Sequence, residues 1–177
     1  MNRAVISAGL VVLATALVES VSAQAPRGDP MEGTWVLNVA KSTFAPGAAP
    51  PRAGSYRYVN RSDGYTMWVS STVGATGIPG FNFSLRKYDG RDYPTYNVTS
   101  LTALVIDGDS SPNTTQSARV IDAYNTELFN KTDGVVVSKV TRTMARDGKS
   151  FIQRTYNPAG ELTGTSVYEK VEQPPTN

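Results

Sequence analysis

The side chains that could transfer protons in this sequence are Asp, Glu, Tyr, Lys and Arg, because its 177 residues include neither histidine nor cysteine. A Ser-His-Asp triad, a Cys-His pair and a His-ligated metal site are therefore excluded. We expect neither a metal nor an organic cofactor. Acid/base chemistry would need a carboxylate inside the fold, close to a Tyr or an Arg.

An aromatic-rich stretch surrounds Asp63-Gly64. Strand alternation places Tyr56, Tyr58 and Asn60 on one face, which is therefore aromatic but partly polar. Phenol hydroxyls beside flat apolar rings can orient a ligand. The alternative is ordinary aromatic packing between paired strands. The ligand contacts predicted here and on the following segment are Tyr56, Tyr58, Met67 and Phe83.

Several arginines fall within segments that read as strands: Arg86, Arg119, Arg142 and Arg154. An inward Arg in a barrel can hold a carboxylate through two parallel hydrogen bonds. We predict that Arg142 and Arg154 contact the ligand. The alternatives are an outward side chain, or a cation that covers Trp35.

Carboxylates at Asp122 and Glu169 also fall within predicted strands. Turned inward among aromatic rings, either would have a raised pKa and could act as a general acid or base. The alternative is surface exposure. The polar stretch "KYDGRDYP" at 87–94 could form a rim at a barrel mouth or a solvated hairpin tip.

The segments that must position these residues are short and separated by turn signals. Asp-Gly, which favours tight hairpin turns, occurs at Asp63-Gly64, Asp89-Gly90, Asp107-Gly108, Asp133-Gly134 and Asp147-Gly148. About ten alternating segments lie between these turns, including one at 102–106. Their faces mix apolar and polar residues, which suits a barrel with a partly polar interior better than a sandwich. We predict an all-β fold: an up-and-down antiparallel β-barrel of about 8–10 strands.

The two ends of the chain read differently from its middle. Residues 1–23 have Arg3, an apolar run and small residues before Gln24, as in a secretory signal peptide. We predict a flexible tether at 24–31, a barrel at 32–172 and a disordered tail at 173–177. The expected location is the periplasm or the exterior of a bacterium, with no stable membrane insertion after cleavage. With a net charge of +2 and no basic cluster, we expect no nucleic-acid partner.

The first predicted strand carries Gly33-Thr34-Trp35. This spacing resembles the Gly-x-Trp motif of the lipocalins and the calycin superfamily. More broadly, the stretches "GTWVLNVAKSTFAPG", "KYDGRDYP", "TRTMARDGKSF" and "VYEK" resemble exported bacterial lipocalin-like proteins. The resemblance implies that Trp35 plugs one barrel end, that Gly33 allows a close backbone approach, and that a late-strand cation, Arg142 or Arg154, covers the indole. The chain departs from many lipocalins in having no clear C-terminal helix.

These features leave three hypotheses open. The first is an exported lipocalin-like barrel that binds a small hydrophobic or amphipathic ligand in its interior. The second is a metal- and cofactor-independent isomerase, cyclase or lyase that uses Tyr, Asp or Glu, and Arg in the cavity. The third is a solid structural barrel whose edges or loops contact partners. The sequence does not specify an oligomeric state.

Overall fold

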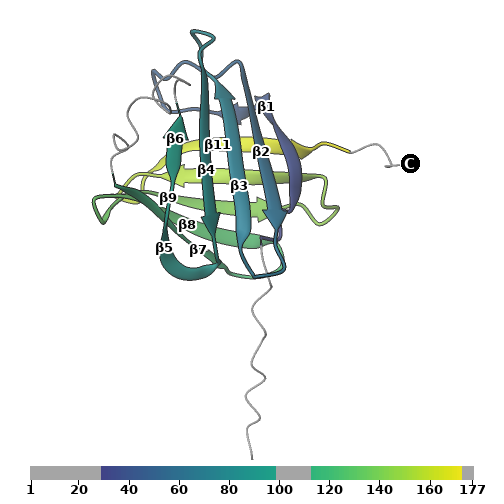
Figure 1. Ribbon diagram of the computed structural model, residues 1–177. Coiled ribbons are helices and arrows are strands. Elements are labelled where there is room, and N and C mark those ends of the chain that lie inside the picture. The colour runs from purple at the N-terminus through teal and green to yellow at the C-terminus, as the bar shows by residue number, and fades with distance from the viewer. Residues whose placement is uncertain (1–28, 99–112, 173–177) are drawn as a thin grey trace, which may run out of the picture.

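The chain forms one antiparallel sheet that curls into a nearly closed barrel (Figure 1). The computed structural model describes residues 29–98 and 113–172, and every regular element in these ranges is a strand. The strands are β1 (Gly33–Thr43), β2 (Ala53–Asn60), β3 (Thr66–Val73), β4 (Pro79–Arg86), β5 (Asp89–Pro94), β6 (Tyr96–Val98), β7 (Thr114–Val120), β8 (Asn125–Thr132), β9 (Val135–Met144), β10 (Ser150–Tyr156) and β11 (Leu162–Lys170). The predicted all-β antiparallel barrel is confirmed, with 11 strands in the described residues.

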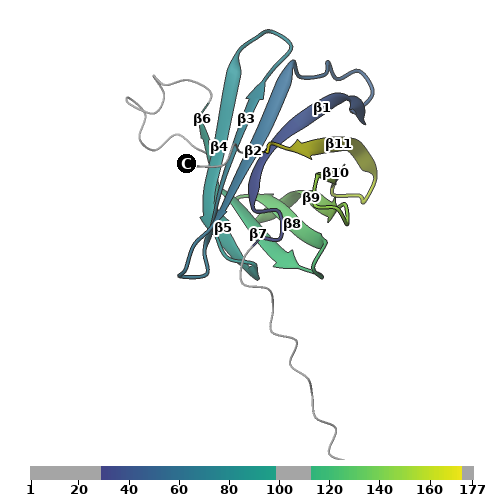
Figure 2. The same ribbon diagram turned by 90° about the vertical axis from the view of Figure 1, so that its right-hand side faces the viewer.

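The sheet order is β5-β7-β8-β9-β10-β11-β1-β2-β3-β4-β6. Its outermost strands, β5 and β6, follow one another in the chain, so the two margins of the sheet come together (Figure 2). A hydrogen bond also crosses this seam, from Ser84 Oγ on β4 to the Pro94 carbonyl on β5, at 2.8 Å. These contacts hold the two margins of the barrel together.

The strands form two groups that cross at a steep angle. In Figure 1, β2, β3 and β4 run across the front while β8 to β11 pass behind them. The long strand β1 joins the groups by pairing with both β2 and β11. Its register against β11 shifts between Asn38 and Thr43, as expected where a strand bends from one layer to the other.

The Asp-Gly turns are only partly as predicted. Asp133-Gly134 joins β8 to β9, and both residues have positive φ, 50° and 78°, as a tight hairpin turn requires. Asp89-Gly90 instead begins β5, which pairs with β7 and not with β4. It therefore marks the corner at which the chain closes the barrel. The predicted Asp107-Gly108 turn and the segment at 102–106 lie outside the described residues.

The N-terminal boundary differs from our prediction. We expected a flexible tether over 24–31, but Asp29 and Met31 are buried, at 1% and 0% exposed. The backbone N–H of Asp29 donates to Asn60 Oδ1 at 2.9 Å, which fixes this segment against β2. Residues 29–31 therefore belong to the barrel. The predicted signal peptide at 1–23 and tail at 173–177 lie outside the described residues.

Candidate functional site

One end of the barrel is closed around Trp35, which is 0% exposed. Its Nε1–H donates to the Met31 carbonyl at 2.7 Å, so the polar atom of the buried indole is satisfied. The ring packs edge-on against Phe151, with centroids 4.9 Å apart. A dry, hydrogen-bonded indole at this position seals the end at which the chain enters.

The cation over this indole is Lys170, whose Nζ lies 5.3 Å from the ring centroid. We expected Arg142 or Arg154 in this role, and that expectation is wrong. Gly33 makes the arrangement possible: its φ is +127°, and a Cβ there would lie 3.0 Å from Lys170 Cε. Glycine therefore leaves room for the lysine side chain as well as for an unusual backbone conformation.

A cavity of about 390 Å³ lies inside the barrel beyond this plug. One wall is aromatic, formed by Tyr56, Tyr58 and Trp68. Most of the remaining lining is polar, comprising Ser70, Thr72, Asn82, Arg86, Thr95, Asn97, Thr114, Thr115, Gln116, Asn130, Lys131, Thr132, Arg142, Gln153 and Thr155, with Leu128, Val137 and Val140. Because exposed residues such as Asn97 and Val137 belong to this lining, the cavity reaches the surface.

Two arginines in the cavity wall, Arg86 and Arg142, are each 1% exposed. They meet at a buried carboxylate: Asp29 Oδ2 lies 3.1 Å from Arg142 Nη2 and 3.9 Å from Arg86 Nη2. The Tyr88 hydroxyl accepts from Arg142 Nη2 at 2.8 Å and from Arg86 Nη2 at 3.1 Å, and donates to Asp29 Oδ2. We call these four residues, Asp29, Tyr88, Arg86 and Arg142, the arginine cluster.

The charges in the arginine cluster do not balance. Burial raises the pKa of Tyr88, so its phenol is neutral at pH 7. Burial lowers the pKa of Arg142, but Asp29 and the neighbouring phenol oxygens outweigh this effect and hold it well above its ordinary value. Two guanidinium cations therefore share one buried carboxylate. Within the described residues, Nε of Arg86 and both Nε and Nη1 of Arg142 have no hydrogen-bond partner.

Two aromatic rings and one amide also contact the guanidinium groups. Arg142 Cζ lies 4.8 Å from the centroid of Tyr58, and Arg86 Cζ lies 5.3 Å from that of Trp68. Arg86 Nη1 donates to Gln116, whose Nε2 donates to Asn130 Oδ1 at 2.5 Å. This chain of side chains fixes the donors and acceptors along the polar wall.

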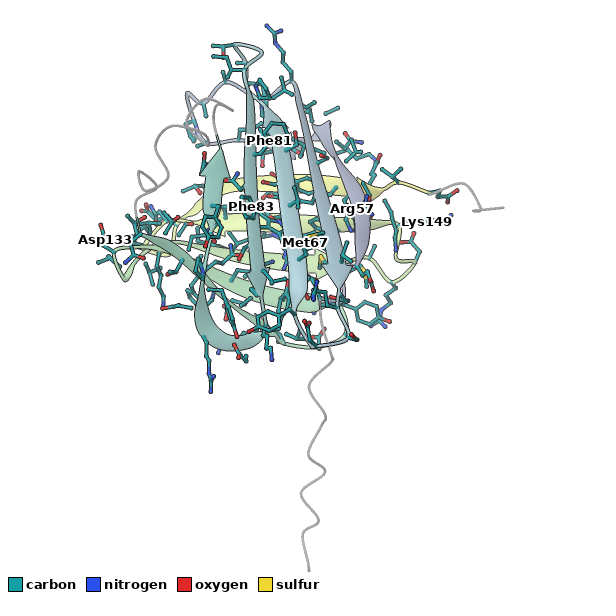
Figure 3. All side chains as sticks on the ribbon, in the orientation of Figure 1. Arg57, Met67, Phe81, Phe83, Asp133 and Lys149 are labelled. Atoms are coloured by element: carbon teal, nitrogen blue, oxygen red, sulfur yellow. The ribbon has the colours of Figure 1, made fainter. Side chains whose placement is uncertain are left out.

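The structure brings half of the predicted ligand contacts into the cavity wall. Tyr56, Tyr58 and Arg142 line it. Met67 and Phe83 do not, because they lie on the outer face at 38% and 40% exposed (Figure 3). Arg154 is also absent from the lining.

Strand alternation explains why Phe83 and Arg154 do not face the cavity. On β4, Asn82 lines the cavity and Ser84 is buried inside, so Phe83 between them must point outward. On β10, Gln153 and Thr155 line the cavity, which places Arg154 on the other face.

The other candidate carboxylates also lie outside the cavity. Asp122 is exposed and accepts from the backbone N–H groups of Tyr124 and Asn125 in the β7–β8 turn. Glu169 pairs with Lys41 at 2.8 Å on the surface. Both are turn or surface groups, as the alternative interpretation held.

Asp29 is the main residue of the cluster that the sequence did not identify, because nothing in "RGDP" distinguishes it from a solvated turn residue. Arg86 was recognisable in part, since it follows Asn82 and Ser84 at the spacing of one strand face. Tyr88 lies in the stretch that we considered as a rim or a hairpin tip, whereas its hydroxyl reaches the interior.

The cluster contains the groups that proton transfer would need, but its carboxylate and its phenol do not line the cavity. A carboxylate beside a Tyr and an Arg was the requirement for the enzyme hypothesis. Asp29 and Tyr88 lie behind the arginines, and within residues 29–98 and 113–172 no Asp or Glu lines the cavity. The part of the wall that the structure describes therefore presents cations and neutral hydrogen-bonding groups.

Comparison with known proteins found no family model that matches this chain and no curated protein that is similar to it. Among residues 29–98 and 113–172, no helix is long and apolar enough to span a membrane.

Proposed function

We propose that this protein is an exported, lipocalin-like carrier that binds a small amphipathic molecule inside its barrel. The observation that carries the proposal is the cavity of about 390 Å³, with Tyr56, Tyr58 and Trp68 on one side and amides, hydroxyls and arginines on the other. This volume is near the lower end for ligand sites, which suits a compact molecule. A flat apolar part would contact the rings, and polar groups would face the opposite wall.

Two further features support the lipocalin-like part of the proposal. The barrel is plugged by the Trp of a Gly-x-Trp motif, and a late-strand cation, Lys170, covers the indole. The predicted signal peptide at 1–23 accounts for the proposed location in the periplasm or outside the cell.

Native mass spectrometry of the mature protein, purified from its own host, tests this proposal. We expect a population heavier than the polypeptide by the mass of one small molecule, and this mass should disappear on denaturation. Its identity would also specify the ligand. A polypeptide mass alone, together with no binding of small aromatic probes in solution, would contradict the carrier function.

A matched pair of variants connects binding to the cavity. Ser70 is 3% exposed and lines the cavity, whereas its neighbour Ser71 lies on the opposite face of β3. We expect Ser70→Phe to reduce the bound fraction strongly, because the ring occupies the cavity. Ser71→Phe should leave the bound fraction unchanged. Equal binding by both variants would place the ligand elsewhere.

A further inference from the structure

The cavity wall is cationic. Three of its side chains, Arg86, Arg142 and Lys131, carry positive charge, and no carboxylate within residues 29–98 and 113–172 lines it. The charge of Lys131 is compensated by an ion pair, because its Nζ lies 2.8 Å from Asp92 Oδ1. Among the carboxylates that the structure describes, the two buried arginines have only Asp29 between them. Two cations and one anion leave one net positive charge at the inner end of the cavity.

Such an uncompensated charge is costly in a protein interior. A buried ion is tolerated when it is paired and its remaining protons find acceptors. Here three guanidinium nitrogens, Nε of Arg86 and Nε and Nη1 of Arg142, have no acceptor within the described residues. The Tyr58 phenol cannot supply the missing anion, since burial raises its pKa well above its ordinary value. The cluster therefore lacks one negative charge and several hydrogen-bond acceptors.

We propose that the ligand carries a single carboxylate, and that this group binds at the inner end of the cavity against Arg86 and Arg142. The inference rests on the proposed carrier function and specifies its ligand class: a compact aromatic monocarboxylic acid. One negative charge matches the one surplus positive charge. A planar carboxylate also fits the hydrogen-bonding geometry of a guanidinium group.

The rest of the lining restricts the body of this acid. The rings of Tyr56, Tyr58 and Trp68 favour a flat group. Opposite them, Asn130 Oδ1 accepts from Gln116 and its Nδ2 donates to Ser138 Oγ at 2.8 Å. Each of these amide atoms has a second hydrogen-bonding position, which a long aliphatic chain would remove from solvent without offering a polar partner. The ligand therefore carries hydroxyl or similar polar substituents and is not a simple fatty acid.

Three probes of similar shape test the inference on the unmodified mature protein by isothermal titration calorimetry. They are 4-hydroxycinnamate, its neutral amide, and tyramine, which is cationic. At pH 7 we expect the acid to bind more tightly than the amide by about tenfold or more, because only the acid supplies the missing charge. Tyramine should bind most weakly.

The possible outcomes separate this inference from the carrier function. If the acid and the amide bind equally, the carrier function stands and the carboxylate preference is wrong. The same conclusion follows if tyramine binds most tightly. If none of the three binds and no small molecule co-purifies, both proposals fail.

A variant that increases the positive charge gives a second test. In Asp29→Asn the arginine cluster carries two net positive charges, so we expect the acid to bind several-fold more tightly than it binds the unmodified protein, and the amide to be unaffected. If Asp29 only supported the fold, its replacement by Asn would not increase the affinity for the acid. Glu169→Gln is the matched control, because it removes an exposed carboxylate that pairs with Lys41. Equal acid affinity in a folded Asp29→Asn protein and in this control would overturn the inference.

Discussion

Asp29 Oδ2 lies 3.1 Å from Arg142 Nη2, across 113 residues of sequence. This contact joins the segment that precedes the first strand to β9, and both side chains are almost fully buried. The N-terminal segment therefore does two things at once. Met31 accepts the hydrogen bond of the plugging indole, and Asp29 provides the only carboxylate that the two interior arginines share among the described residues.

The first prediction concerns the stability that Asp29 provides. Asp29→Asn should lower the free energy of unfolding by about 3–5 kcal/mol in the absence of ligand, because it leaves two buried guanidinium groups without a counterion. Urea denaturation at pH 7 measures the change. The control Glu169→Gln should leave the free energy of unfolding almost unchanged, since its pair with Lys41 is exposed. Equal effects of the two substitutions would contradict the importance of the buried contact.

The second prediction concerns Gly33. Gly33→Ala should destabilise the barrel by about 1–3 kcal/mol, because alanine disfavours a φ of +127° and its Cβ would meet Lys170 Cε at 3.0 Å. Gly80→Ala is the control: its φ is not in the left-handed region, and its Cβ would meet the Thr72 carbonyl at 4.0 Å. Thermal unfolding of the two variants compares them. A melting temperature as high in Gly33→Ala as in Gly80→Ala would show that this glycine is dispensable.

The sequence identifies the barrel better than it identifies the cavity. Gly33, Trp35 and the Asp133-Gly134 turn act locally, so their patterns predict local structure correctly. On β4, however, alternation shows only that Phe83 and Arg86 lie on opposite faces. The usual preference for buried aromatic residues selects the wrong face here, because Arg86 is held inside by Asp29.

The contact between Asp29 and Arg86 joins distant parts of the sequence, so no local sequence pattern reveals it. Met67 was misplaced together with Phe83, since it lies on the same outer face of the neighbouring strand, where it pairs with Leu85. Arg154 was misplaced because the sequence does not indicate which face of β10 borders the cavity.

The third prediction concerns the two tryptophans. Trp68→Phe leaves Trp35 as the single tryptophan of the chain. Its emission should be blue-shifted and almost insensitive to acrylamide, because the indole is 0% exposed and hydrogen-bonded to the Met31 carbonyl. Stern–Volmer quenching measures this, with the urea-unfolded variant as the accessible reference. Native emission that is quenched as strongly as the unfolded reference would mean that the barrel end is not sealed.

The fourth prediction concerns pH and an ion pair on the outer face of the barrel. Glu127 is 7% exposed and accepts from Arg119 Nε at 2.7 Å and from Lys139 Nζ. Burial tends to raise the pKa of this carboxyl, but Lys139 and Arg119 outweigh that effect and lower it below the ordinary value of 4.5. Stabilisation by Glu127 is therefore fully present above about pH 4.5 and is lost as the pH falls through the lowered pKa of the folded state.

We accordingly expect Glu127→Gln to cost about 1 kcal/mol at pH 7, since both cations are partly exposed, and progressively less below pH 4.5. Urea denaturation from pH 7 to pH 3.5 measures the difference without adding salt, which would screen the charges. Glu172→Gln is the control: Glu172 and its partner Lys149 are 3.9 Å apart and highly exposed, so this variant should match the unmodified protein at every pH. A Glu127→Gln deficit that stays constant as the pH falls would show that Glu127 stabilises the barrel by packing rather than by its charge.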